Sequence, residues 1–502
     1  MSTRNKSTLK INAMSALILQ IVVAVIGIFL PRLILAAFGS EVHGLTSSIT
    51  QFLSYISLME AGTGSVVKAA LFKPLAAGDH EGVSATLNAC KKFFRTIALI
   101  FLAYVLILAV IYPFFSANQS FTYDFIFTLV LILGISTFSQ YFFCLTYRIL
   151  LQADQKIYFD NFLQIITLIL NFIMSAVLIY GGAGIRMVKL VSALVCLITP
   201  IAINIYVRKK YSINKKAVAN KDSLKNRWDG LGHHIAFFVH KNTDIVILTF
   251  FSNLNEVSVY AVYNMIVSAI QGLLSSLSSS VTSKFGELFA KDDKSKLELA
   301  FSQYETLIFA IATLLFSITG IMIIPFVEYY TMDIIGVNYI RPWFAYFIVF
   351  AEFIYAIRAP YSNLVFAVGE FKETRNGAII EAIINIVISI SLVWWLGIIG
   401  VAIGTLAAML YRTLDYVIYL NKHVIHRPIK IFVKNILMNT SVFVLGLVLC
   451  NLCILPLFTF NSFLIWTVCA VIVSIIMLVL IFAFQMLFNK KYFLSSLKFF
   501  LN

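Results

Sequence analysis

The sequence predicts an all-α protein that crosses a membrane many times, and three observations support this fold class. Hydrophobic residues make up 60% of the 502 positions, charged residues only 12%, and the mean hydropathy is +0.92. A water-soluble chain would normally carry about 25% charged residues. Apolar runs of roughly 20 residues recur along the chain, which is the length that a helix needs to cross the hydrocarbon layer.

The apolar runs predict fourteen transmembrane helices. Some connections are very short, such as residues 39–41 and 252–255, so we expect the helices that they join to form antiparallel hairpins. The first run is too long for the apolar part of a signal peptide, so we interpret it as a membrane helix. The expected bounds are 11–37, 43–71, 93–115, 123–148, 158–180, 185–207, 231–251, 257–283, 301–326, 342–368, 376–396, 398–420, 431–455 and 461–488.

The distribution of basic residues predicts the orientation of the chain. Fourteen spans place both termini on one side of the membrane, and the side richer in Lys and Arg is the cytoplasm. On this assignment 31 of the 38 Lys and Arg residues are cytoplasmic, including those of the long basic stretch 208–230. The bilayer therefore accounts for the net charge of +15, and no single basic patch indicates a nucleic-acid partner.

An internal repeat predicts the arrangement of the helices. Matches at an offset near 216 residues extend over more than a hundred positions, and six helices separate the two copies. An even number gives both copies the same orientation, so we expect two bundles related by a pseudo-two-fold axis along the membrane normal, with a central cleft. The expected parts are bundle 1–207, linker 208–230, bundle 231–425, and 426–502 with two additional helices and a cytoplasmic tail. The matched pairs are Gly181 and Gly397, Gly184 and Gly400, Asp154 and Glu370, Lys156 and Lys372, and Lys68 and Lys284.

The helix plan and two short segments resemble a known family. Residues 39–45 read GSEVHGL and residues 58–64 read LMEAGTG. With six plus six plus two helices, the chain resembles the polysaccharide transporter branch, with its Wzx-type lipid-linked oligosaccharide flippases, of the multidrug/oligosaccharidyl-lipid/polysaccharide exporter superfamily. The resemblance covers nearly the whole chain and does not specify the substrate.

The resemblance implies a function and a location. It implies a multi-pass protein of the bacterial inner membrane that moves an undecaprenyl-diphosphate-linked oligosaccharide from the inner to the outer leaflet by alternating access. The glycan is a capsule, O-antigen-like or teichoic-acid repeat unit, and glycan-assembly proteins are expected partners. The resemblance also implies that predicted helices 1, 2, 7 and 8 line the cavity, and that helices 13 and 14 form a groove for the lipid tail.

Predicted helix 7 carries the polar face best suited to a lipid diphosphate. His233, Phe237, His240, Lys241 and Asp244 follow helical spacing and share one broad face. Lys241 lies near the bilayer midplane, where a charge costs about 2.5–3.5 kcal/mol unless it meets water or a partner. Two interpretations stay open: Lys241 binds the diphosphate, with Asp244 as a coupling or ion site, or the two residues form a structural pair at i, i+3. Their counterparts in the first half are apolar, which favours a function.

Three other intramembrane charges are candidate site residues. Arg32 follows Pro31 near the outer end of helix 1 and either binds substrate or extends to the interface. Arg358 stands two residues before Pro360, where it contacts substrate or satisfies carbonyl groups freed by a kink. Glu60 either couples transport to an ion gradient or is a neutral packing group.

Polar residues on predicted helices 8, 11 and 12 complete the candidates. Asn264 and Gln271 lie with a row of serines on helix 8, where they either bind sugar hydroxyls or hydrogen-bond between helices. We interpret two further pairs as structural, namely Arg412 with Asp415 and Glu381 with Asn385.

Several function classes are not supported by the sequence. It contains no Gly-Lys dipeptide, hence no P-loop, and no loop cluster of metal ligands. The six cysteines are expected to be packing residues. We therefore expect no cofactor, no metal and no enzymatic activity. The main alternative to the flippase is a MATE-like cation-coupled exporter of drugs or small molecules, which needs acids in its cavity and normally has twelve helices. A membrane-embedded glycan polymerase is disfavoured because the outer loops are short.

Overall fold

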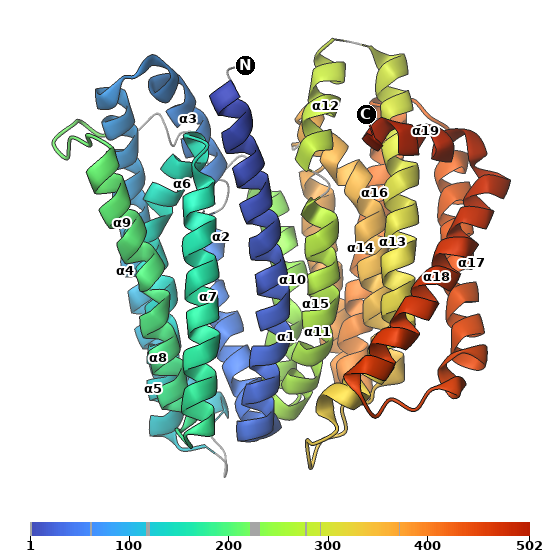
Figure 1. The fold of residues 1–502 in the computed structure, drawn as a ribbon, viewed down its shortest axis with the longest axis horizontal. Coiled ribbons are helices and arrows are strands. Elements are labelled where there is room, and N and C mark those ends of the chain that lie inside the picture. Colours follow the sequence, from blue (N-terminus) through green and yellow to red (C-terminus); the bar gives the residue numbers. More distant parts are fainter. Residues whose placement is uncertain are drawn as a thin grey trace. The chain divides into compact units, whose positions relative to one another are not determined.

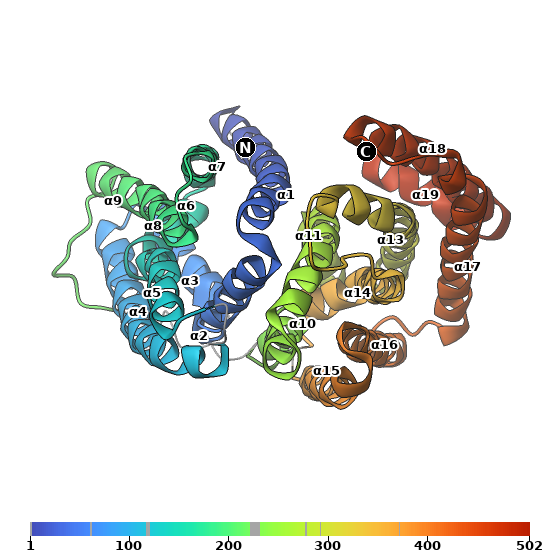
Figure 2. The ribbon, with the colours of Figure 1, turned by 90° about the horizontal axis from the view of Figure 1, so that it is seen from below.

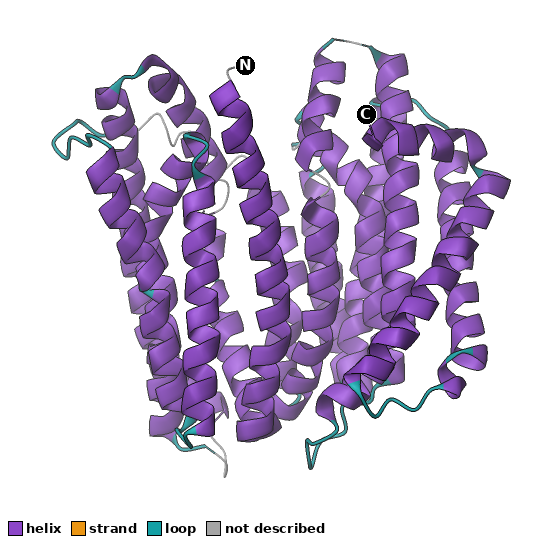
Figure 3. Ribbon diagram, viewed as in Figure 1, coloured by secondary structure: helices purple, strands orange, loops and turns teal. Residues whose placement is uncertain are grey.

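The computed structural model describes residues 3–60, 63–116, 121–220, 231–276, 279–291, 293–370 and 372–501. Over these residues the chain consists of helices joined by loops and turns (Figure 3). It divides into two compact units, with the boundary between His234 and Ile235. We call the part up to His234 unit 1 and the part from Ile235 onward unit 2, and describe each by itself.

The first helix of unit 1 is interrupted by a glycine. Helix α1 (Thr3–Ser54) contains one non-helical residue, Gly39, with φ 79° and ψ 176°. Residues with a Cβ rarely adopt a positive φ, so glycine is the residue suited to this turn. In Figure 1 the arm before Gly39 descends and the arm after it returns upward. The predicted break near residues 39–41 is therefore present.

The two arms of α1 pack against different helices of unit 1. The first arm lies along α7 (Ile157–Tyr180), where the Asn161 amide donates to the Ser15 hydroxyl at 3.0 Å. The second arm meets α4 (His80–Ser116), whose Tyr112 hydroxyl donates to the Ser48 hydroxyl at 2.7 Å. These buried polar contacts fix the helices where apolar surfaces alone would let them slide.

The remaining helices of unit 1 follow α1 with short connections. The segments α5, η1 and α6 form one span, in which a π-helical turn interrupts the α-helix, and α8 and α9 form another. A π-helical turn adds one residue to the turn and so shifts the faces of the helix that follows. The bounds are α2 (Ser57–Glu60), α3 (Thr63–Ala77), α5 (Tyr123–Ser139), η1 (Gln140–Cys144), α6 (Leu145–Ala153), α8 (Ile185–Cys196) and α9 (Ile198–Lys210).

Unit 2 holds ten α-helices among its described residues. Helices α15 and α16 pack closely, because Gly400 and Gly404 of α16 face Leu392 and Ser389 of α15 with no space for a Cβ. Viewed from below, α17 and α18 lie beside α13 (Figure 2). The bounds are α10 (Leu231–Phe251), α11 (Leu254–Ser276), α12 (Ser279–Ala290), α13 (Lys294–Thr331), α14 (Pro342–Val368), α15 (Arg375–Leu396), α16 (Ile398–His423), α17 (Ile429–Cys453), η3 (Leu455–Leu457), α18 (Phe463–Phe488) and α19 (Lys490–Leu501).

The two units share one feature of helix order. In each unit a long helix follows a shorter one: α4 with 37 residues follows α3, and α13 with 38 residues follows α12. The internal repeat, its offset near 216 residues and the symmetry axis that relates the two copies stay predictions.

The chain is a multi-pass membrane protein. Twelve helices in the described part of the chain are long and apolar enough to cross a membrane, which confirms the predicted all-α polytopic class. The number of fourteen stays a prediction. One of the twelve, Lys10–Glu60, includes both arms of α1, and the polar helix α10 is not among them.

Candidate functional site

Glu352 is the centre of a buried polar cluster in unit 2. Its Oε1 lies 3.2 Å from His240 Nε2 and 3.9 Å from Lys241 Nζ. The Gln271 amide donates to Glu352 Oε2 at 2.7 Å and to the Glu352 carbonyl oxygen at 2.8 Å. Three helices, α10, α11 and α14, thus meet at one carboxylate. His240, Lys241 and Gln271 were predicted as site residues from the sequence. The structure brings their side chains together around Glu352.

Exposure distinguishes the members of this cluster. The side chains of His240 and Glu352 are 2% and 6% exposed, whereas that of Lys241 is 26% exposed. His240 Nδ1 meets no hydrogen-bonding group among the described residues. Because the ammonium of Lys241 is accessible and lies at a long distance from its carboxylate, it is the cation of the cluster that can contact an anion from outside.

An aromatic ring supports the two basic residues. The ring of Tyr355 stacks on the ring of His240 with centroids 4.7 Å apart. Lys241 Nζ lies 5.6 Å from the same centroid, and the guanidinium of Arg358 lies 4.6 Å from it. A cation over an aromatic face is stabilised by the ring quadrupole. Tyr355 therefore joins the Glu352 cluster to the charges around Arg358.

The predicted pair of Lys241 with Asp244 is not formed. Asp244 Oδ2 accepts hydrogen bonds from the hydroxyls of Tyr260 and Thr405, both at 2.9 Å. The two residues of α10 point about 60° apart around the helix, so they face different neighbouring helices. Tyr260 of α11 and Thr405 of α16 satisfy Asp244, while Glu352 of α14 is the carboxylate nearest to Lys241.

A second group of charges neutralises Arg358. Glu381 Oε1 lies 2.6 Å from Arg358, and Glu381 Oε2 lies 3.5 Å from Arg412. Arg412 also pairs with Asp415 at 2.5 Å, as predicted. Two arginines and two acids thus compensate one another inside unit 2, and Arg358 also contacts the ring of Tyr355. Its role in substrate binding stays a prediction.

Glu352 lies on the same helix as Arg358, six positions earlier, and the two side chains point about 120° apart. One sequence expectation near this group is wrong. Asn385 was expected beside Glu381, but its amide donates to the Thr405 hydroxyl at 3.0 Å. Asn385 and Thr405 therefore form a hydrogen-bonded row that ends on Asp244.

The other predicted site residues have contacts of their own. Asn264 of α11 accepts a hydrogen bond from Ser268 at 3.2 Å. In unit 1, Glu60 accepts one from the Tyr141 hydroxyl at 3.0 Å, and Arg32 lies half-buried on the first arm of α1. The side chain of His233 lies outside the described residues.

The sequence analysis missed Tyr355, Tyr260 and Thr405. Each is an uncharged residue on an apolar helix, so only its contacts distinguish it from a packing residue. It also missed the ion pair between Arg427 and Glu305, which are separated by 122 residues.

An apolar groove lies between α17 and α18. Its volume is about 630 Å³, and Leu437, Met438 and Phe484 line it. Two cations, Lys430 and Lys434, lie at the same groove, and Lys434 Nζ donates to the carbonyl oxygen of Phe488 at 2.7 Å. The groove thus combines an apolar wall with positive charge, at the two helices for which the resemblance implies a lipid-tail groove.

No family model and no curated protein matches the chain. Several solved structures do match the chain. A structure of the lipid II flippase MurJ in an inward closed conformation matches with a TM-score of 0.70 and 17% identity, covering 96% of this chain and 99% of that chain. An inward-facing multidrug resistance MATE transporter of the MOP superfamily matches with a TM-score of 0.58 and 16% identity, covering 80% of this chain and 94% of that chain. A mutant of the Vibrio cholerae MATE transporter VcmN matches with a TM-score of 0.54 and 15% identity, covering 85% of this chain and 100% of that chain. The chain therefore has the fold of the lipid II flippase structure and of these MATE transporter structures.

Proposed function

We propose that this protein is a flippase that moves an undecaprenyl-diphosphate-linked oligosaccharide from the inner to the outer leaflet by alternating access. Its proposed location is the bacterial inner membrane, with both termini in the cytoplasm and with glycan-assembly proteins as partners. The fold supports this proposal, because the flippase structure covers 96% of the chain and the two MATE structures cover 80% and 85%.

The observation that carries the proposal is the accessible ammonium of Lys241 beside Glu352. A diphosphate brings negative charge into a layer of low dielectric constant, where an opposite charge stabilises it strongly. A lysine held 3.9 Å from its carboxylate keeps donors free for such an anion. The ring of Tyr355, which stacks on His240, lies 5.6 Å from the ammonium and helps to hold it in place.

The remaining parts of the substrate have matching candidates. The groove between α17 and α18 suits an apolar chain, and Lys430 and Lys434 suit the phosphate to which that chain is attached. Asn264 and Ser268 offer hydrogen-bonding groups for sugar hydroxyls. Arg32 is a second cation proposed to contact the substrate.

Coupling of transport to an ion is assigned to two intramembrane acids that accept hydrogen bonds from neutral donors, Asp244 in unit 2 and Glu60 in unit 1. Asp244 receives only neutral donors, Tyr260 and Thr405, and Glu60 receives Tyr141. Such acids can exchange a proton or bind a cation without breaking a salt bridge.

A cation exporter is the second candidate function. The observation that favours it is the presence of two buried acids, Glu352 and Asp244, on helices that meet at the same cluster. An exporter of this kind would use the carboxylates for its substrate, and Lys241 would then be a counter-ion to Glu352.

The test replaces both members of the Lys241–Glu352 ion pair in one variant. Lys241→Gln alone leaves Glu352 buried without its cation, so the variant to compare is Lys241→Gln/Glu352→Gln, which keeps the site neutral and hydrogen-bonded. Lys241→Arg keeps the charge. The matched control is Lys291→Gln/Glu287→Gln, because this pair is of the same type but both side chains are more than 60% exposed.

Each variant is reconstituted in liposomes with a fluorescent undecaprenyl-diphosphate-linked oligosaccharide. We expect the Lys241/Glu352 double variant to fold and lose translocation, the arginine variant to keep part of it, and the control to match the wild type. Normal translocation by the folded double variant would contradict the proposal. Efflux of a cationic dye by the wild type, without lipid translocation, would support the exporter.

A further inference from the structure

A pocket of about 550 Å³ lies in unit 1. It is built by α4, α6, the end of α9 and the loop that follows α9. This volume falls within the ~300–1,000 Å³ that is usual for small-molecule sites. Three basic residues, Lys91, Arg208 and Lys215, line it, and none of its eleven lining residues is acidic.

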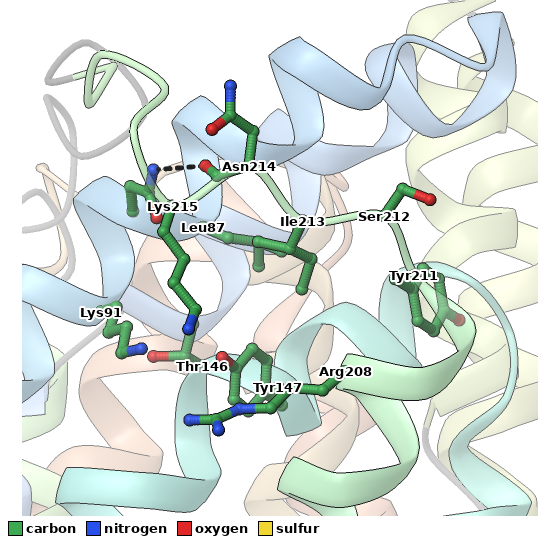
Figure 4. A pocket seen from close by; sticks show the side chains of 11 residues that line it. Leu87, Lys91, Thr146, Tyr147, Arg208, Tyr211, Ser212, Ile213, Asn214 and Lys215 are labelled. Atoms are coloured by element: carbon green, nitrogen blue, oxygen red, sulfur yellow. Dashed lines mark hydrogen bonds between the residues drawn. The ribbon is translucent and has the colours of Figure 1, made fainter.

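The three cations converge on one space. Figure 4 shows the amines of Lys91 and Lys215 and the guanidinium of Arg208 directed toward one another, with Thr146 and Tyr147 between them. None of the three forms an ion pair with a carboxylate in the described part of the chain. Like charges brought together repel, so this arrangement is stabilised when an anion enters.

The loop that carries Lys215 is fixed in place by hydrogen bonds. The Asn88 amide of α4 donates to the carbonyl oxygens of Asn214 and Ala217, at 3.1 and 3.0 Å (Figure 4 draws the first). The backbone N–H of Asn214 donates to the Ser84 hydroxyl at 3.0 Å. The pocket is therefore formed before any ligand binds, because its wall is anchored on α4.

The nearby acid Asp154 is already occupied. It accepts hydrogen bonds from the Tyr211 hydroxyl and from Lys156. Burial, and then the hydrogen bond to Asp154, raise the pKa of Tyr211 above its ordinary value, so this hydroxyl stays protonated and remains a donor. Asp154 thus holds the wall of the pocket and does not neutralise its three cations.

The pocket lies at the end of membrane-spanning segments. Arg208 belongs to the last turn of a candidate span that ends at Lys210. Basic side chains at the ends of spans lie at the level of lipid headgroups, where phosphate groups are abundant. Apolar side chains, Leu87 and Ile213, form part of the wall, which suits a ligand that carries carbon beside its phosphate.

We propose that this pocket binds a phosphate group through Lys91, Arg208 and Lys215. The site shares no residue with the cluster around Glu352 and does not depend on the proposed function. The phosphate comes either from the headgroup of an anionic lipid or from a soluble phosphate compound, and the experiment below separates the two sources.

The test compares two double variants of equal charge. Lys91→Gln/Lys215→Gln removes two cations of the pocket. The matched control, Lys209→Gln/Lys216→Gln, removes the neighbouring exposed cations, which do not line it. The full-length protein in detergent is titrated with inorganic diphosphate, with dioctanoyl phosphatidylglycerol and with dioctanoyl phosphatidylcholine. Binding is measured by the shift in melting temperature and by native mass spectrometry.

We expect the wild type and the control to bind an anionic probe alike, and the pocket variant to bind it about 25-fold more weakly, roughly fivefold for each lysine removed. Binding of the diphosphate identifies a soluble ligand, and binding of phosphatidylglycerol alone identifies a headgroup. The proposal is overturned if neither anionic probe binds the wild type, if both double variants lose affinity equally, or if phosphatidylcholine binds as tightly as phosphatidylglycerol.

Discussion

The guanidinium of Arg427 and the carboxylate of Glu305 form a bidentate ion pair, with nitrogen–oxygen distances of 2.8 and 2.9 Å. Glu305 lies on α13, and Arg427 lies in the connection between α16 and α17. Tyr361 of α14 also donates to Glu305. The pair is fully buried. It connects the segment that leads into α17 to helix α13.

We expect Arg427→Met to lower the melting temperature of the purified protein by roughly 10 °C, since an unpaired buried carboxylate costs about 3–5 kcal/mol. The double variant Arg427→Met/Glu305→Gln should recover much of this loss, because the amide is uncharged and Tyr361 still reaches it. The measurement is thermal unfolding in detergent, with Lys291→Gln as the exposed control. A double variant as unstable as Arg427→Met would show that the charge pair is not the cause.

Gly377 of α15 gives the Arg412–Asp415 pair its space. A Cβ at this position would lie 2.0 Å from Asp415 Oδ2 and 2.2 Å from Arg412 Nη1. We therefore expect Gly377→Ala to destabilise the protein by about 1–3 kcal/mol, as overpacking does. Gly27→Ala is the matched control, because nothing lies within 4 Å of its added Cβ, and it should be neutral or slightly stabilising. The measurement is thermal unfolding of both variants. Equal melting temperatures would contradict the packing argument.

Tyr355 is expected to act through its ring. Tyr355→Phe keeps the face that contacts His240, Lys241 and Arg358, whereas Tyr355→Leu removes it. We predict near-normal translocation of the lipid-linked oligosaccharide by the phenylalanine variant and a loss of at least about fivefold by the leucine variant, which corresponds to ~1 kcal/mol for a cation–π contact. Both proteins must show the wild-type melting temperature in detergent. Equal transport by the two variants would assign Tyr355 to packing alone.

The predicted orientation can be tested with single cysteines. Lys221 belongs to the basic stretch 208–230, so Lys221→Cys should resist a membrane-impermeant thiol reagent in intact cells and react after permeabilisation. Ile335 belongs to a predicted outer loop and its side chain is 95% exposed, so Ile335→Cys should react in intact cells. The opposite labelling pattern would invert the topology.

Much of the fold follows from local features of the sequence. The apolar runs predicted the helices, and Gly39 marks the turn within α1 because a positive φ favours glycine. The spacing of His240, Lys241 and Asp244 predicted that α10 has a polar side. Helical periodicity is a property of a few consecutive residues, so such features can be recognised without knowing the neighbours.

The partners of these residues could not be recognised in the same way. Asp244 and Thr405 are 161 residues apart, and Tyr355 looks like any aromatic residue of a membrane helix. Proximity in sequence suggested Asp244 as a partner of Lys241 and Asn385 as a partner of Glu381. Rotation around the helix turns these side chains toward different neighbours, so residues of other helices became their partners.

By itself the sequence determined the all-α membrane fold class and the presence of a cation on α10, because hydropathy and helical period are encoded locally, whereas the repeat near 216 residues stays a prediction. Only the tertiary structure decided which acid faces that cation, that Arg358 is neutralised by Glu381, and that Lys91, Arg208 and Lys215 line one pocket. The physical reason is that an ion pair or a pocket requires atoms within a few ångströms, and helix packing brings together side chains that lie far apart along the chain.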